Sequence, residues 1–149
     1  MALIDLISKD VVKVPLESKT KTEIVRELLK VLKDAGKLEN LEKAYDAIMA
    51  RERLGSTGLE DGIAVPHAKT DVVDTLTLAI GISPGGVDFE AIDGKPSQLF
   101  FLMLAPPGQS GPHIEALSEI ARLTKSKAFC RTLIEARSAD EVVEIFRED

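Results

Sequence analysis

The sequence contains one cysteine, Cys130, and no tryptophan among its 149 residues. A single cysteine excludes an internal disulfide and any site built on paired cysteines, and it is typical of a protein in a reducing compartment. No apolar run reaches the roughly 18 residues that a transmembrane helix needs. The N-terminal segment MALIDLISKDVVKVPL carries acidic residues within its apolar run and lacks a small-residue cleavage site, so no signal peptide is predicted. We therefore expect a cytoplasmic protein.

The sequence also has no excess of basic over acidic residues. The 25 acidic residues outnumber the 19 lysines and arginines, and the formal net charge is -6. Nucleic acids and anionic membranes are bound through clustered Lys and Arg, so this balance argues against both as partners. The length is that of an ordinary domain, and we predict one domain over residues 1–149 whose core needs no disulfide to hold it together.

Helical periodicity dominates the N-terminal half, after a short β-branched strand predicted in VVKVPLES. In TKTEIVRELLKVLKDAG, Thr20 and Glu23 form a capping box, apolar residues follow at helical spacing, and a glycine ends the helix. The segment NLEKAYDAIMARERLG repeats the pattern up to Gly55. Its last turn holds Arg51 and Arg53, where cations suit the helix dipole.

Two near-continuous apolar runs, LTLAIGIS and SQLFFLMLAPP, predict central strands of a sheet that is covered on both faces. IAVPH predicts a short buried strand or strand end, and PGG and IDGKP predict turns. Further helices are predicted over 112–125 and 127–136. A second capping box, Ser138 with Glu141, starts the last helix. Helices that flank a buried sheet make an α/β sandwich.

The first candidate functional residue is His67, which follows a predicted glycine loop, GSTGLEDG, over 55–62. Pro66 restricts its own φ and restrains Val65, so the backbone that enters His67 is stiff. Closely spaced glycines suggest that something approaches the main chain. A lone histidine beside an apolar strand is by default a core or surface residue, and its position alone leaves these interpretations open.

His113 and Arg51 are the second and third candidates. Pro112 suits the first helical position, which puts His113 in a first turn whose N–H groups attract anions and disfavour imidazolium. Arg51, just before the glycine loop, can bind a phosphate in bidentate fashion. The alternatives are a surface histidine and a solvated last-turn cation, and Glu52 and Arg53 are assigned to that solvated face.

The possible chemistry is narrowed by the motifs that do not occur. No HxH or HExxH supplies closely spaced ligands, which makes a metal site the weaker hypothesis. GxSxG and GxxxxGK[ST] are also missing, which argues against a serine hydrolase and a P-loop. A neutral imidazole that attacks phosphorus fits best, because the reference histidine pKa of about 6.5 leaves it mostly unprotonated at neutral pH. Arg51, the glycine loop and His113 can supply the charge and N–H donors that a phosphoryl group in transit needs.

The segment ARERLGSTGLEDGIAVPHAK, residues 50–69, is similar to the active-site signature of the enzyme IIA domains of the bacterial sugar phosphotransferase system, mannitol/fructose class. FEAIDGKPSQLFFLMLAP and HIEALSEIARL also resemble that family, so the resemblance covers essentially the whole chain. The signature reads R-E-x-x-x-x-T, a glycine-containing loop and then a-[IV]-P-H. It is matched by Arg51, Glu52, Thr57, Gly58, Gly62, Ala64, Pro66 and His67.

The resemblance implies a mixed β-sheet flanked by helices on both faces. It implies that His67 accepts a phosphoryl group from the carrier protein HPr as a tele-phosphohistidine and passes it to a cysteine of a IIB domain, which feeds a IIC permease. His113 takes the position of a second, supporting histidine, and Arg51 that of the arginine near the phosphate. No metal or other cofactor is implied. The substrate-binding residues expected in the loop are Thr57, Gly58 and Gly62.

The branch of the family is open at this point. GSTG and AIDGKP resemble the fructose and nitrogen-regulatory branches more than the mannitol branch. In the regulatory branch the phosphorylation state controls partner proteins and no sugar is imported. Cys130, within KAFCRTLIEA, is predicted to be a buried residue of apolar character and not a phosphocysteine.

Overall fold

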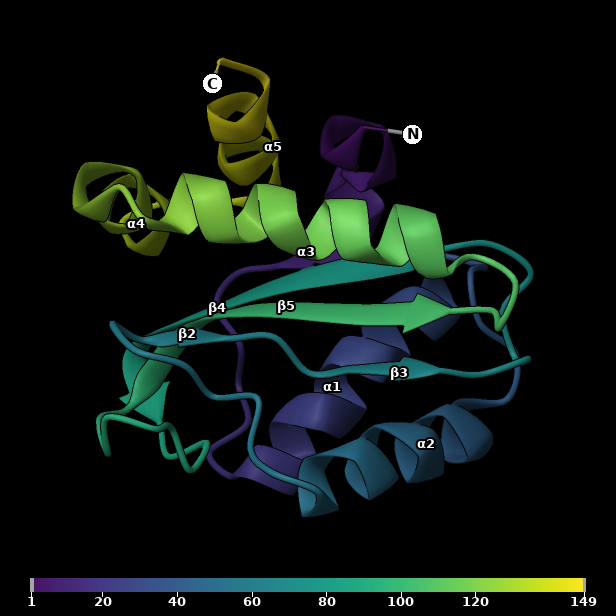
Figure 1. Cartoon of the computed structure of the whole chain (residues 1–149). Coiled ribbons are helices and arrows are strands. Elements are labelled where there is room, and N and C mark those ends of the chain that lie inside the picture. Colours follow the sequence, from purple (N-terminus) through teal and green to yellow (C-terminus); the bar gives the residue numbers. More distant parts are fainter. Residues whose placement is uncertain (1, 149) are drawn as a thin grey trace.

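The computed structural model describes residues 2–148, and within them one five-stranded sheet lies between two layers of helices (Figure 1). The strands are β1 Val12–Lys13, β2 Ile63–Ala64, β3 His67–Lys69, β4 Thr77–Val87 and β5 Ser97–Ala105. The helices are α1 Lys21–Asp34, α2 Leu41–Arg53, α3 Ser110–Thr124, α4 Lys127–Ile134 and α5 Ala139–Glu148. Two 3-10 turns, η1 Leu3–Leu6 and η2 Lys9–Val11, precede β1.

The sheet is mixed, in the order β1-β4-β5-β2, with β3 also paired to β5. Strands β4 and β5 are joined by a short loop and pair antiparallel. The pairs β1–β4, β2–β5 and β3–β5 are parallel, and each has intervening helices or strands along the chain. Figure 1 shows α1 and α2 on one face and α3, α4 and α5 on the other. The predicted α/β fold, a mixed sheet with helices on both faces, is confirmed.

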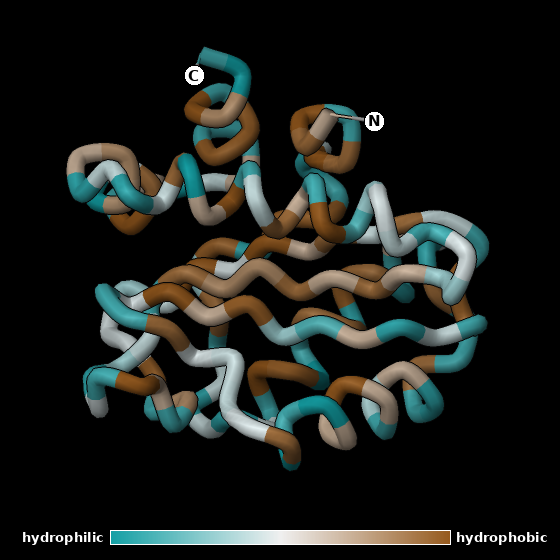
Figure 2. The backbone as a smooth tube through the Cα atoms, in the orientation of Figure 1, coloured by the Kyte–Doolittle hydropathy of each residue, from teal (hydrophilic) through white to brown (hydrophobic). Residues whose placement is uncertain are grey.

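The two central strands supply the core of both layers. Along β5, Leu99, Phe101 and Met103 pack into the cluster that α3, α4 and α5 cover, while Phe100 and Leu102 pack into the cluster under α1 and α2. Successive side chains of a strand point to opposite faces, so a strand buried on both must be apolar at every position. Figure 2 shows this as an apolar band through the strands between more polar outer surfaces.

Some predicted strand boundaries were wrong. The strand expected in VVKVPLES is only Val12–Lys13, because η2 occupies the residues before it and the proline after it lacks an N–H for pairing. The turn expected at PGG lies inside β4, where the register with β5 shifts between Ile82 and Val87. The pairing is irregular over these residues, and the strand continues through them. The strand expected in IAVPH is divided into β2 and β3 on either side of Val65 and Pro66.

The N-cap half of each predicted capping box is present, while the Glu23 carboxylate accepts from the Thr20 hydroxyl and the Glu141 carboxylate from the N–H of Arg137. Thr20 Oγ1 accepts from Glu23 N at 3.3 Å, and Ser138 Oγ accepts from Glu141 N at 3.1 Å. Cys130 is buried as predicted, and burial raises the pKa of its thiol. Helix α4 ends two residues earlier than expected. None of the helices in residues 2–148 has the length and apolar character to cross a bilayer.

Gly81 in β4 tests how closely α1 packs on the sheet. A Cβ there would lie 2.7 Å from side-chain carbons of both Leu16 and Leu28. We expect Gly81→Ala to lower the free energy of unfolding by about 1–3 kcal/mol because these side chains must move. Gly85→Ala, on the same strand with open space around it, is the control and should change stability by less than about 0.5 kcal/mol. Urea unfolding followed by circular dichroism measures both, and equal values would contradict the close packing.

Candidate functional site

His67 is held at the start of β3 by the adjacent central strand. It pairs in register with Met103, whose N–H donates to the carbonyl of Pro66 at 3.0 Å. The proline ring restricts the backbone just before the histidine. His67 is half-buried. The backbone is therefore anchored while part of the imidazole remains accessible.

The tautomer of His67 is set by a backbone carbonyl. Its Nδ1 lies 2.7 Å from the carbonyl oxygen of Val65. A carbonyl oxygen can only accept, so the neutral ring carries its hydrogen on Nδ1 and donates it to Val65. The lone pair of the neutral ring is then on Nε2. The structure thus presents Nε2, and not Nδ1, as a nucleophile.

His113 lies against His67, as the site prediction requires. The two ring centroids are 5.3 Å apart and the planes are inclined by 73°. His113 is 5% exposed, so the alternative interpretation as a surface histidine is wrong. Burial first, and then the electrostatic influence of His67 and Lys69, lower the pKa of His113 and favour the neutral imidazole. Its Nε2 is buried and has no hydrogen-bond partner among the described residues.

The start of α3 differs from the prediction. The helix begins at Ser110 and not at Pro112, with Gln109 as the N-cap. The N–H of His113 already donates to the carbonyl of Gln109 at 3.2 Å, so it is not one of the free donors of a first turn. The Gln109 side chain accepts from the N–H of Leu76 at 2.9 Å and ties the helix start to the sheet. Burial, and not the helix end, is what keeps His113 neutral.

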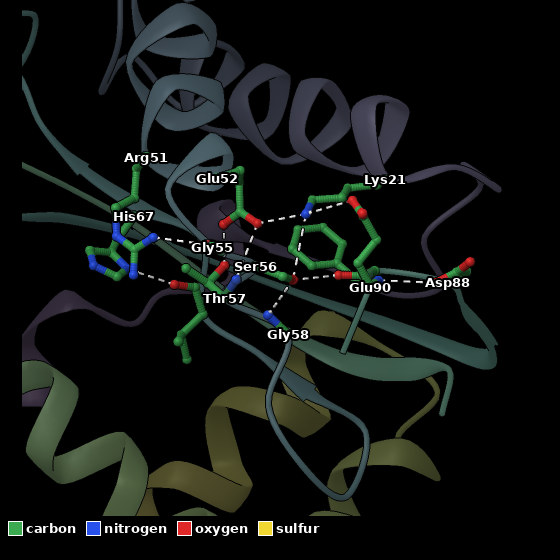
Figure 3. A network of polar contacts seen from close by, with 12 residues as sticks. Lys21, Arg51, Glu52, Gly55, Ser56, Thr57, Gly58, His67, Asp88 and Glu90 are labelled. Carbon is green, nitrogen blue, oxygen red and sulfur yellow. Dashed lines mark hydrogen bonds and ion pairs between the residues drawn. The ribbon is translucent and has the colours of Figure 1, made fainter. Parts of the chain in front are cut away.

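Arg51 extends from the last turn of α2. Its Nη1 donates to the carbonyl of Gly55 at 2.9 Å, and in the view of Figure 3 the guanidinium reaches toward His67. That bond uses one of the five N–H donors of a guanidinium. The side chain is half-buried. The loop carbonyl therefore orients the group, and a role on a phosphate stays a prediction.

The three predicted loop residues make internal contacts that shape the loop. Thr57 is 3% exposed, and its N–H donates to Glu52 Oε1 at 3.1 Å while its hydroxyl donates to the second carboxylate oxygen. A Cβ at Gly58 would lie 2.9 Å from the Cα of Ala91, so only glycine fits. Gly62 has φ of +79° and accepts two N–H groups from β5. Direct contact of these residues with a substrate stays a prediction.

Glu52 does not lie on a solvated face, contrary to the prediction. It is 6% exposed, and its carboxylate pairs with Lys21 Nζ at 2.8 Å (Figure 3). The sequence held a signal for this burial, since Glu52 continues the spacing of four from Ala44 and Ile48, the other buried residues of α2. Arg53 is exposed, as predicted. No local pattern links Lys21 to Glu52, because the pair joins two different helices.

The site therefore combines a half-buried nucleophilic nitrogen, a buried neutral imidazole with an unpaired nitrogen, and an oriented guanidinium. Transfer of a phosphoryl group requires a nucleophile in line with phosphorus, with cations and N–H donors around the oxygens. Within residues 2–148, no three His, Cys, Asp or Glu side chains are grouped so that they can hold a metal ion. The arrangement suits nucleophilic chemistry on phosphorus.

His113 should stay neutral at pH values where an ordinary histidine is charged. Because its folded pKa is lowered, the folded protein binds fewer protons than the unfolded chain. The stability from the neutral form is present above about pH 6.5 and is lost as the pH falls through the folded pKa. An NMR pH series should show the His113 ring titrating below free histidine, and His113→Leu should reduce the loss of stability on acidification. Titration of His113 at the free-histidine midpoint would contradict this expectation.

Comparison with known proteins places this geometry in a family. Residues 5–149 match the family described as "Phosphoenolpyruvate-dependent sugar phosphotransferase system, EIIA 2". The chain is 38% identical over 148 residues to the PTS system fructose-specific EIIABC component of Bacillus subtilis (strain 168). That alignment covers 99% of this chain but only 23% of the Bacillus protein, so the chain spans about a quarter of that relative's length.

Two solved structures share the fold. The crystal structure of nitrogen regulatory protein IIA-Ntr from Neisseria meningitidis has a TM-score of 0.88 and 31% identity, and covers 96% of this chain and 97% of its own. The IIAMTL–phosphorylated IIBMTL complex from Escherichia coli contains a chain with a TM-score of 0.81 and 23% identity, with 96% and 98% covered. The family match takes in both histidines and the whole Arg51-to-His67 segment. The protein accordingly belongs to the EIIA 2 family of the phosphoenolpyruvate-dependent sugar phosphotransferase system.

Proposed function

We propose that this protein is a cytoplasmic phosphocarrier that accepts a phosphoryl group from phospho-HPr on His67 Nε2. It then passes the group to a cysteine of a IIB domain that serves a IIC permease in fructose-type sugar uptake. The observation that carries the proposal is the 2.7 Å contact from His67 Nδ1 to the carbonyl of Val65. This contact leaves the Nε2 lone pair available in a family of phosphotransfer proteins.

The acceptance step is an in-line displacement between two imidazoles. The Nε2 lone pair attacks phosphorus, a new N–P bond forms, and the N–P bond of the donor phosphohistidine breaks. The donor imidazole leaves with the electron pair of the broken bond. His67 keeps its Nδ1 hydrogen and becomes a positively charged ring, so its bond to the Val65 carbonyl becomes charge-assisted and strengthens. The donor is already a phosphoramidate, so positioning and electrostatics supply the catalysis.

His113 and Arg51 have distinct supporting roles in this proposal. Arg51 offers a planar cation that can bind two phosphoryl oxygens at once. The ring centroid of His113 lies 5.3 Å from that of His67, and its buried Nε2 has no partner among the described residues. When this nitrogen carries the ring hydrogen, it can donate a hydrogen bond to a phosphoryl oxygen. A neutral ring provides this contact without placing a second full charge beside the phosphorylated imidazole.

Exposed apolar side chains next to these residues support the docking of a partner protein. Leu54, three residues after Arg51, is 85% exposed, and Ile114, directly after His113, is 63% exposed. Large apolar groups at the surface are common in protein interfaces. A carrier must release both its donor and its acceptor. We therefore expect a transient interface of less than about 1,200 Å².

The second candidate function is that of a nitrogen-regulatory protein. It is favoured by the likeness to IIA-Ntr from Neisseria meningitidis, at a TM-score of 0.88. In this case His67 is phosphorylated in the same way, and the added negative charge changes which partner proteins bind the surface. Protein labelled with 32P and mixed with a purified fructose-type IIB domain separates the two. Transfer of the label supports sugar uptake, and retention of the label supports regulation.

The phosphoryl acceptor is tested with His67→Gln. Glutamine keeps a polar side chain of similar length but has no nucleophilic nitrogen. With enzyme I, HPr and 32P-phosphoenolpyruvate, labelling of the variant should fall to background. His113→Gln is the matched control and should still be labelled. A labelled His67→Gln protein would overturn the assignment.

The supporting role of His113 is tested with His113→Ala. We expect the variant to accept phosphate from phospho-HPr but to pass it to a IIB domain at least about tenfold more slowly, since an electrostatic contact to the phosphoryl oxygens is lost. Rapid-quench measurement of both half-reactions provides the rates. Onward transfer at the wild-type rate would show that His113 has no part in the step.

A further inference from the structure

A buried ion pair lies behind the loop that precedes His67. The Glu52 carboxylate, on α2, is 2.8 Å from Nζ of Lys21, the first residue of α1. The same ammonium group reaches Glu90 at 3.1 Å and lies 4.8 Å from the centroid of the Phe89 ring. Removing two charges from water is costly, and one partner without the other is costlier still. We therefore expect this ion pair to have a structural role, namely to fix the position of a neighbouring polar group.

The group held by this ion pair is Thr57. The Glu52 carboxylate accepts both from its N–H, at 3.1 Å, and from its hydroxyl. Hydrogen bonds to an ionised acceptor are stronger than neutral ones. The adjacent residue is anchored as well, since Ser56 Oγ donates to the carbonyl of Phe89 at 2.7 Å and accepts from Gly58 N at 3.0 Å. The backbone of Thr57 thus has a single orientation.

From Thr57 the contacts continue directly to the nucleophile. The carbonyl of Thr57 accepts from the N–H of Val65 at 3.0 Å. The carbonyl of Val65 in turn accepts from His67 Nδ1 at 2.7 Å. Both polar backbone groups of Val65 are therefore occupied, one by the loop and one by the histidine. An unbroken series of polar contacts connects Lys21 to the imidazole, and Figure 3 shows most of its members together.

We propose that Glu52 and Lys21 are positioning residues that, through Thr57 and Val65, hold His67 in its Nδ1–H tautomer. If the Val65 carbonyl turns away, the ring hydrogen can move to Nε2, and a protonated Nε2 has no lone pair for phosphorus. The carbonyl must also hold the charged ring of the phosphorylated state. The consequence for phosphoryl transfer rests on the proposed function, whereas the consequence for the tautomer does not.

The tautomer is measured by 15N NMR of the imidazole at about pH 8, on the unphosphorylated protein and without any partner. In the wild type we expect His67 to be almost entirely the Nδ1–H form. In Glu52→Gln and in Lys21→Met a substantial Nε2–H population should appear. These two variants should also be phosphorylated more slowly than the wild type, by about tenfold to a hundredfold, when the small molecule phosphoramidate is the donor. In that reaction the P–N bond of the donor breaks and ammonia leaves.

Three further variants separate positioning from mere stability. Lys21→Arg keeps the charge and should recover most of the Nδ1–H form that Lys21→Met loses. Val143→Ala removes buried volume from α5, on the opposite face of the sheet, and should lower stability with no change of tautomer. Thr57→Val replaces the hydroxyl with a methyl group and removes only the hydroxyl bond to Glu52, so it decides the question if Glu52→Gln does not fold.

The outcomes are distinct. A folded Glu52→Gln or Thr57→Val protein with the wild-type tautomer and rate would overturn the positioning role. So would a tautomer change of the same size in Val143→Ala. If the variants shift the tautomer while the wild type takes no phosphate from phospho-HPr, the positioning role stands and the proposed function fails.

Discussion

Pairing to β5 is the constraint on which the site depends. This strand is hydrogen-bonded to β2, β3 and β4, and its side chains are buried on both faces of the sheet. The register of β3 on β5 places His67 opposite Met103. The helix that follows β5 in sequence carries His113 back over the sheet to His67. A one-residue shift of the strand would move both histidines and would exchange the side chains that face the two helical layers.

The residues next to His67 and the residues behind the loop carry charge in different ways. Next to the nucleophile, burial keeps His113 neutral, and Arg51 is the oriented cation. Behind the loop, the Glu52 carboxylate is buried against the Lys21 ammonium group and accepts two hydrogen bonds from Thr57. Buried ion pairs add little to stability when hydrophobic residues of similar volume could replace them. The proposed role of the Lys21–Glu52 pair is to orient the backbone at Thr57.

Much of the fold could be predicted because the signals are local. The caps at Thr20 and Ser138 depend on a backbone N–H three residues away, and the apolar runs on β4 and β5 reflect burial on both faces. Predictions failed where distant contacts override local preference. The PGG segment would end most strands, but β4 resumes its pairing with β5 at Val87 after a shift in register. Helix α3 starts early, and its N-cap Gln109 is bound to the backbone N–H of Leu76, which immediately precedes β4.

For the site, the order of residues from Arg51 to His67 was enough to predict the family and to propose His67 as the phosphoryl acceptor. It was not enough to predict that His113 is buried or that Glu52 pairs with Lys21, because burial and this ion pair depend on segments far apart in the chain. The resemblance implied the tele nitrogen of His67, and the structure supplies a geometric reason for it in the position of one carbonyl oxygen. Such positions arise only when the helices, the loop and the sheet pack together. Residue types and spacing therefore carry the chemistry, and three-dimensional packing sets its geometry.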